Sequence, residues 1–206
     1  MSPEAVPPSI SIRLLQLFVD TANQEVGAEK LPLILSGVLL SPSVIEMDMV
    51  LSLDGMRAAE IYALVQQSLR LFYGRGARGI LLRIGQGMWE HHVAQADFRE
   101  KAELEIARRL PVPARRRHIL DLVAALLREG GGEISVHTLD LDFLLVDHAS
   151  ASAFGQSSSE PICLVTLGML QQALSWATGL EPDIEEITCK AMGAPTCEFK
   201  IKPGGK

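Results

Sequence analysis

Cysteine is scarce in this chain: three occur in 206 residues. The sequence does not open with a charged segment followed by an apolar one, so nothing in it marks the chain for secretion. Few cysteines without a secretion signal indicate the reducing cytoplasm, where clustered thiols more often bind metal than form disulfides. We therefore expect a cytoplasmic protein with reduced thiols.

Positive charge and long apolar runs are lacking too. The formal net charge is −6, whereas nucleic-acid binding needs a basic face. Arg115–Arg117 is the one tight basic run, which we interpret as a solvated helix start. No run of apolar residues approaches the roughly 18–20 that a membrane-spanning helix needs. The sequence predicts neither nucleic-acid binding nor a membrane span.

Apolar residues recur every three or four positions through most of the chain, which indicates helices. The predicted helices cover residues 12–26, 31–40, 55–73, 76–95, 97–109, 113–128 and 162–178. Gly79, Gly85 and Gly87 within one of them would allow another backbone or a ligand to approach closely. Residues 1–9, rich in proline, are expected to form a flexible tail before a single domain at 10–203.

The period changes to two in two places, which predicts hairpins. The first comprises strands at about 133–138 and 141–148, and the second lies within 183–202 with its turn at 193–195. Helices followed by hairpin, helix and hairpin indicate an α+β fold, an antiparallel sheet of about four strands with one face covered by helices. We hypothesise a large covered cavity between the helices and the sheet.

Two of the cysteines lie symmetrically about a glycine. Cys189 and Cys197 are each four positions from Gly193, so they face each other in a hairpin centred there. Directly opposed residues have Cβ atoms about 4.5–5.5 Å apart. Two thiolates on one tetrahedral zinc need sulfurs a little under about 4 Å apart, which this pair can reach.

Further ligands are available nearby. Cys163 begins a predicted helix, whose dipole favours a thiolate, and Glu185 and Glu186 are the acidic candidates. Glu186 is an odd number of positions from Cys189, so it points to the opposite face unless the strand bulges or begins later. The fourth ligand is then Glu186 or water. The alternative is three buried, inert cysteines.

The same stretch carries a recognisable pattern. "EPICLVTLGMLQQALSWATGLEPDIEEITCKAMGAPTCEFKI" resembles the C-terminal signature of the 4-vinyl reductase domain family, also called the hydrocarbon-binding domain. The matching positions within 161–202 are Pro161, Cys163, Gly168, Trp176, Gly179, Glu186, Cys189, Gly193, Cys197 and Phe199. Upstream, Tyr73 to Gly85 resembles the family's central helix entry, so the likeness spans about residues 60–202.

This family is similar to the sensor domains of phenol- and xylene-responsive activators and, more distantly, to TRAPP subunits. The resemblance implies a TRAPP-like ligand-binding fold, a homodimer and an interior pocket for a hydrophobic or aromatic small molecule. It also implies a structural zinc on Cys163, Glu186, Cys189 and Cys197. That zinc would tie the last hairpin to the helix that begins at Cys163.

Four residues are candidate ligand contacts. His118 occupies a place similar to that of a ligand-binding histidine in the aromatic sensors, and His148 lies near the place of their tryptophan. Trp89 and His92 are three apart on one helical face and could line a pocket. The alternatives are a half-exposed histidine at a helix start, a core tryptophan and a boundary histidine.

The sequence favours a binding module over an enzyme. It has no nicotinamide or flavin fingerprint and no Ser/His/Asp set, and a closed zinc site leaves no open position for catalysis. We expect non-catalytic binding or sensing of a hydrophobic small molecule, with occupancy passed to a downstream signalling protein. One alternative is a tetrapyrrole-binding accessory protein or enzyme of bacteriochlorophyll synthesis, with His118, His92 or His148 as axial ligand. Another is an adaptor that holds an acyl chain.

Overall fold

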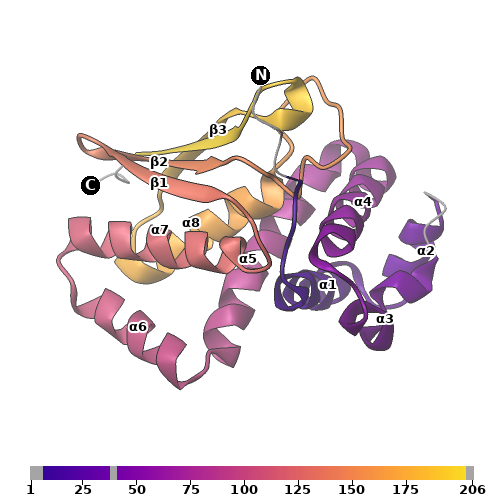
Figure 1. The fold of residues 1–206 in the computed structure, drawn as a ribbon, viewed down its shortest axis with the longest axis horizontal. Coiled ribbons are helices and arrows are strands. Elements are labelled where there is room, and N and C mark those ends of the chain that lie inside the picture. Colours follow the sequence, from indigo (N-terminus) through magenta and orange to yellow (C-terminus); the bar gives the residue numbers. More distant parts are fainter. Residues whose placement is uncertain (1–6, 38–40, 203–206) are drawn as a thin grey trace.

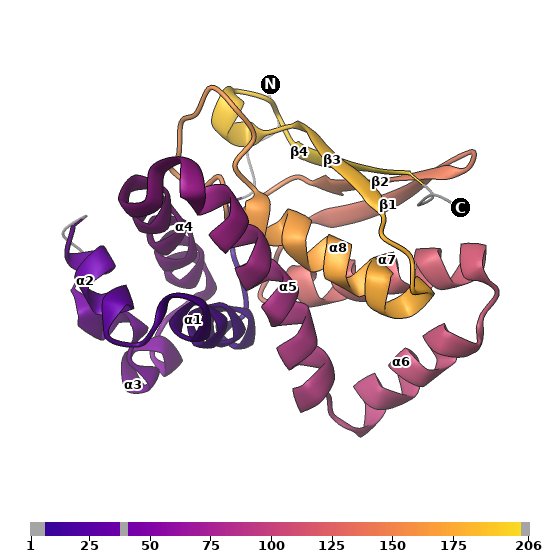
Figure 2. The ribbon, with the colours of Figure 1, turned by 180° about the vertical axis from the view of Figure 1, so that it is seen from behind.

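In a computed structural model, which describes residues 7–37 and 41–202, helices form most of the molecule and one sheet lies at one side. The described residues contain eight α-helices and a four-stranded antiparallel sheet. Figures 1 and 2 show α7 and α8 against one face of the sheet and the first four helices gathered at the far end of the molecule. The predicted α+β class is confirmed.

The N-terminal helices are α1 (Ile12–Val26), α2 (Lys30–Ser36), α3 (Met47–Leu51) and α4 (Gly55–Tyr73). Helix α1 begins where the hydroxyl of Ser11 accepts the N–H of Leu14 over 3.1 Å. The predicted helix at 31–40 is shorter than expected, because α2 ends at Ser36, and residues 38–40 lie outside the described residues.

The central helices are α5 (Ala77–Gln95), α6 (Phe98–Arg109) and α7 (Val112–Arg128). A capping box starts α6: Asp97 Oδ1 accepts the N–H of Glu100, and Glu100 Oε2 accepts the N–H of Asp97, both over 2.8 Å. The box fixes the Glu100 carboxylate at the first turn of α6.

Helices α5 and α8 (Leu164–Thr178) cross at two glycines. A Cβ on Gly85 would lie 2.0 Å from the carbonyl oxygen of Val165, and one on Gly168 would lie 2.1 Å from that of Leu82. Only glycine permits backbones this close. Of the three glycines expected to allow close approach, Gly85 therefore meets a backbone. Gly87 meets the Thr21 side chain at 2.6 Å, and Gly79 meets only Arg83 at 3.4 Å.

Helix α8 is the most thoroughly buried helix of the structure, with ten of its fifteen residues buried among α5, α7 and the sheet. Its polar residues agree with the predicted buried helix of a globular protein. Across residues 7–37 and 41–202, no helix combines the length and the apolar character that crossing a membrane requires.

The sheet consists of β1 (Ile134–Leu139), β2 (Asp142–Asp147), β3 (Asp183–Thr188) and β4 (Cys197–Lys202). Its strand order is β1-β2-β4-β3, with antiparallel neighbours throughout. Alternate side chains of each strand face the helices, as a half-buried sheet requires. The buried face is formed mainly by Phe143, Leu145, Ile184, Phe199 and Ile201.

The segment before α1 packs against the body of the protein. Ile10 is buried, its N–H donates to the carbonyl of Gly55 over 3.1 Å, and the hydroxyl of Ser9 donates to the carbonyl of Gly130. Of the predicted tail at 1–9, residues 1–6 lie outside the described residues.

Candidate metal centre and ligand groove

Three thiols and one carboxylate converge at the end of the sheet. Cys163 directly precedes α8, Glu186 lies in β3, Cys189 follows β3, and Cys197 begins β4. The sulfur of Cys163 is 3.4 Å from that of Cys197 and 3.8 Å from that of Cys189. The sulfurs of Cys189 and Cys197 are 3.8 Å apart. One ligand atom from each of the four residues lies within 4.8 Å of all the others.

A β-bulge brings the carboxylate to this cluster. Glu186 pairs with Phe199 and Thr188 with Glu198, so the register shifts by one residue at Ile187. The extra residue reverses the alternation of side chains, which turns Glu186 to the face of the cysteines. The odd spacing between Glu186 and Cys189 is thereby accommodated, and Ile187 is left 44% exposed.

Backbone hydrogen bonds hold the four residues in place. The N–H of Cys163 donates to Glu186 Oε2 over 2.9 Å, and the N–H of Lys190 donates to the sulfur of Cys197 over 3.2 Å. The ammonium of Lys190 donates to the carbonyls of His148 (2.9 Å) and Pro195 (3.0 Å), which closes the hairpin loop.

The buried cluster resists carrying several negative charges. Hydrogen bonds from Cys163 and Cys197 lower the pKa of Cys189, so its thiolate is stabilised. S–H donation to Cys189 and Cys197 raises the pKa of Cys163. The hydrogen bond from Cys163 lowers the pKa of Cys197, but donation to Cys189 and burial outweigh it and raise that pKa to about 12. Burial raises the pKa of Glu186 to about 8. A cation would remove this mutual repulsion.

The donor set fits a metal ion. All three cysteines are free thiols and buried, and Oε1 of Glu186 is buried without a hydrogen-bond partner. An unpaired buried carboxylate oxygen is costly, so its position beside three sulfurs calls for a positive partner. Three sulfurs and one oxygen are ligands that a tetrahedral metal accepts. The cluster can therefore hold one metal ion.

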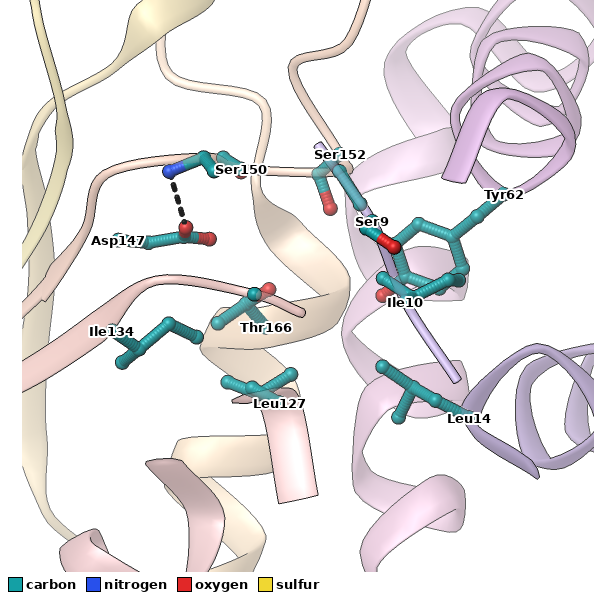
Figure 3. Close-up of a pocket in the computed structure, with 13 residues that line it drawn as sticks. Ser9, Ile10, Leu14, Tyr62, Leu127, Ile134, Asp147, Ser150, Ser152 and Thr166 are labelled. Carbon is teal, nitrogen blue, oxygen red and sulfur yellow. Dashed lines mark hydrogen bonds between the residues drawn. The ribbon is translucent and has the colours of Figure 1, made fainter. Parts of the chain in front are cut away.

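A small cavity lies between α4, α8 and the sheet (Figure 3). Its volume is about 20 Å³, room for roughly one water molecule. Its lining includes Tyr62, Asp147, Ser150, Ser152 and Thr166. Burial raises the pKa of Asp147 to about 6. The large covered cavity hypothesised from the sequence is not found here, because side chains of the helices fill the space above the sheet.

A much larger groove of about 560 Å³ lies between α1, α5, α6 and α7. Leu104 on α6 and Leu122 and Leu126 on α7 form its apolar part. Its polar lining residues are Arg13, His92, Asp97, Arg99, Glu100, Glu103 and Glu129.

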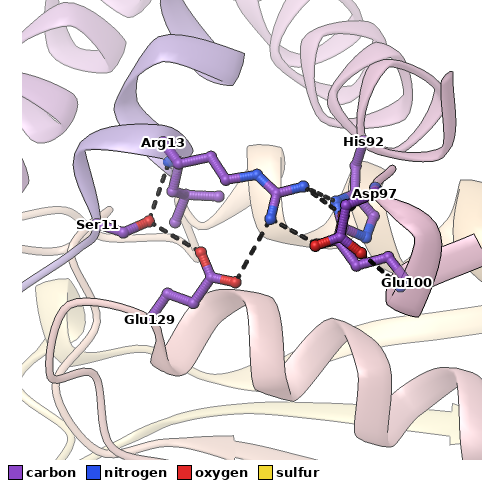
Figure 4. A network of polar contacts seen from close by, with 7 residues as sticks. Ser11, Arg13, His92, Asp97, Glu100 and Glu129 are labelled. Atoms are coloured by element: carbon purple, nitrogen blue, oxygen red, sulfur yellow. Dashed lines mark hydrogen bonds and ion pairs between the residues drawn. The ribbon is translucent and has the colours of Figure 1, made fainter. Parts of the chain in front are cut away.

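Arg13 is the centre of the polar wall (Figure 4). Its guanidinium donates to both oxygens of Glu100, with 3.0 Å to Oε2, and its Nη2 lies 3.2 Å from Nδ1 of His92. Oε1 of Glu129 is 3.8 Å away. The hydrogen bond to Glu100 raises the pKa of Arg13, and the same bond lowers the pKa of Glu100. The pair therefore stays ionised.

The predicted ligand contacts are distributed unequally. His92 lines the groove. Nε2 of His118 is 3.4 Å from Glu103 Oε2, at the edge of the groove. Trp89 is fully buried, with its ring 5.3 Å from that of His92, and forms part of the core. His148 lies beyond β2, where its Nε2 is 3.4 Å from Ser135 Oγ. Trp89 and His148 are not among the groove's lining residues.

Sequence reasoning missed Arg13, Glu100 and Glu129. The Asp97-x-x-Glu100 spacing before a helix marked the capping box. Nothing in the local sequence connects Arg13 with a residue 87 positions away, because that contact arises only when α1 packs beside α6.

Comparison with known proteins extends the sequence result. The family model of the 4-vinyl reductase domain matches residues 148–203. This stretch contains all four residues of the candidate metal centre, and the predicted resemblance to the 4-vinyl reductase family is confirmed over it. No curated protein matches the chain.

Solved structures share the fold at low identity. The phenol-responsive sensory domain of the transcription activator PoxR, with phenol, is 17% identical over 70% of this chain and 74% of its own, with a TM-score of 0.51. An H-NOX protein from S. oneidensis in the Fe(II) ligation state is 14% identical over 94% and 95%, with a TM-score of 0.58. A structure described as modulating haem redox potential through porphyrin distortion is 12% identical over 92% and 97%, with a TM-score of 0.54. The chain is similar to these proteins in fold.

Proposed function

We propose that this protein binds an apolar small molecule in the groove between α1, α5, α6 and α7, without converting it chemically. The groove itself is the observation that carries this proposal. Its volume of about 560 Å³ falls within the roughly 300–1,000 Å³ typical of small-molecule sites. Such sites combine apolar walls with a few polar groups, and this groove has both.

The apolar wall supplies the affinity. Burying a ligand against Leu104, Leu122 and Leu126 removes apolar surface from water, worth about 25 cal/mol per Å². Helix α6 is the wall that we expect to adjust to the ligand, because only Leu104 and Ala107 of its twelve residues are buried. Few buried contacts make local displacement of a helix inexpensive.

We propose zinc as the metal at Cys163, Glu186, Cys189 and Cys197. Zinc prefers thiolate ligands in tetrahedral sites, and four protein ligands leave no open position, which indicates a structural role. Bound there, zinc would supply charge neutralisation and a crosslink. The protein's own contribution is to hold the bulge of β3, the start of β4 and the start of α8 together.

We propose further that occupancy of the groove is a signal read by a partner protein. The family match at residues 148–203 and the fold shared with a phenol-responsive sensory domain support a sensory role. Homodimerisation, expected from the family resemblance, remains a prediction.

Tetrapyrrole binding is the second candidate. The observation that favours it is His118, whose Nε2 is buried without a hydrogen-bond partner at the groove edge. The likeness in fold to a structure whose description concerns haem adds support. An absorption band of the purified protein in the visible range, lost in His118→Ala, would establish this alternative.

The main proposal is tested with N-phenyl-1-naphthylamine, an uncharged dye that fluoresces in apolar surroundings. We expect saturable fluorescence with the wild type. Ala125→Trp fills the groove from α7 and should abolish it, whereas Ala102→Trp, exposed on α6 outside the lining, should not. Equal binding by both variants would exclude the groove as the site.

A further inference from the structure

Arg13 determines which nitrogen of His92 carries the proton. Nη2 of Arg13 lies 3.2 Å from Nδ1 of His92. A guanidinium only donates hydrogen bonds, so Nδ1 must accept. Burial is the main cause that lowers the pKa of His92, with Arg13 adding to it and Glu100 opposing it, so the ring is neutral near pH 7. A neutral imidazole that accepts at Nδ1 carries its proton on Nε2.

This proton is available to a ligand. In the part of the chain that the structure describes, no group is hydrogen-bonded to Nε2 of His92, although the residue as a whole is only 6% exposed. Nε2 is also not among the fully enclosed polar atoms without a partner. His92 lines the groove, so an N–H donor, held in one orientation by packing against Trp89, faces the space that the ligand would fill.

We infer that Nε2–H of His92 is the specificity donor of the groove and selects uncharged ligands that carry an oxygen acceptor, such as ketones, aldehydes, esters and ethers. This inference rests on the proposed function, because it assigns the ligand class of the same groove. His92 acts by contact with the ligand, and Arg13 is a positioning residue that fixes the tautomer.

Charged ligands fit less well. An anion would meet four carboxylates, those of Asp97, Glu100, Glu103 and Glu129, against the two cations Arg13 and Arg99. A cation beside His92 would face the guanidinium of Arg13 and an N–H, both positive ends. Either charge would also lose its hydration next to the leucine wall.

The same tautomer disfavours His92 as an iron ligand. A histidine that binds metal through Nε2 carries its proton on Nδ1 and donates it to an acceptor. At Nδ1 of His92 stands the donor Arg13 instead. The inference therefore separates His92 from the axial role that the sequence had left open for it.

The test uses two probes of nearly equal shape, 2-acetylnaphthalene and 2-isopropenylnaphthalene, which differ in a carbonyl oxygen. A hydrogen bond worth about 1 kcal/mol predicts that the wild type prefers the ketone about five-fold. His92→Phe should remove the preference and keep the hydrocarbon's affinity within about two-fold. Arg99→Met, a lining residue without a contact to His92, should retain the preference.

The outcomes separate the two claims. Binding of both probes with equal affinity by wild type and His92→Phe overturns the inference and leaves the groove as a binding site. Binding of neither probe overturns the proposed function and, with it, the ligand class.

Nitrogen-15 NMR of the free protein tests the tautomer without any ligand. We expect a protonated Nε2 and an unprotonated Nδ1 in the wild type, and a mixture of tautomers in Arg13→Met. A proton on Nδ1 in the wild type would overturn the inference by itself.

Discussion

The backbone N–H of Cys163 donates a hydrogen bond of 2.9 Å to Oε2 of Glu186, 23 residues further along the chain. This bond joins the start of α8 to the bulge of β3. It leaves Oε1 of Glu186 buried and without a hydrogen-bond partner, next to the sulfurs of Cys189 and Cys197. The carboxylate is thus positioned as a fourth metal ligand before any metal is bound.

Substitution of this carboxylate should weaken metal binding. Glu186→Gln removes a charged ligand, so we expect at least about a ten-fold loss of zinc affinity, comparable to or larger than the effect of outer-shell changes. Competition with a chromophoric chelator measures it. Glu185→Gln, the exposed neighbour on the opposite face, is the control and should match the wild type. If Glu186→Gln also matches the wild type, water and not Glu186 completes the site.

Removal of a thiolate should have a larger effect. Cys189→Ser takes away the cysteine whose thiolate the cluster stabilises most. We expect the bound metal to fall from one per chain to none, measured by elemental analysis of purified protein, with a lower thermal midpoint. Wild-type protein treated with a chelator should show the same lowered midpoint. Unchanged metal content in Cys189→Ser would assign the metal to another site.

The crossing of α5 and α8 predicts a strong effect of a single methyl group. Gly168→Ala would place its Cβ 2.1 Å from the carbonyl oxygen of Leu82, so we expect a loss of about 1–3 kcal/mol in the free energy of unfolding. Gly79→Ala in α5 meets only the end of the Arg83 side chain and should be neutral or stabilising by up to about 1 kcal/mol. Urea unfolding of the two variants tests this contrast, which equal effects would contradict.

Stability should fall on mild acidification through His92. Burial lowers its pKa in the folded state below the value of about 6.5 in the unfolded chain. Between the folded and unfolded pKa values the unfolded state binds more protons, so this contribution is fully present above about pH 6.5 and is lost as the pH falls below it. Urea unfolding at about pH 7.5 and about pH 5.5 measures the difference. It should shrink in His92→Gln, and an unchanged difference would contradict the assignment.

The helices and the sheet could be predicted because their signals are local. Hydrophobic periodicity and the caps at Ser11 and Asp97 place α1 and α6 to within a residue or two. The symmetry of Cys189 and Cys197 about Gly193 predicts their facing register, which the pairing of Thr188 with Glu198 continues. The need for a bulge near Glu186 follows from the odd spacing alone.

The groove could not be predicted because it depends on packing between distant segments. Arg13 and His92 are 79 positions apart, and neither position has a distinctive local pattern. The expected large cavity over the sheet was wrong in place, since its volume depends on how residues such as Tyr62 and Ile10 fill it. The sequence showed apolar faces but not the gap that α6 leaves between them.

The most direct test of the account is methyl NMR of leucine-labelled protein during titration with 2-acetylnaphthalene. The account predicts saturable shifts of the Leu104, Leu122 and Leu126 methyl groups, which line the groove. Shifts confined to Leu14 and Leu127, which line the small cavity beside the sheet, or no shifts at all, would contradict it.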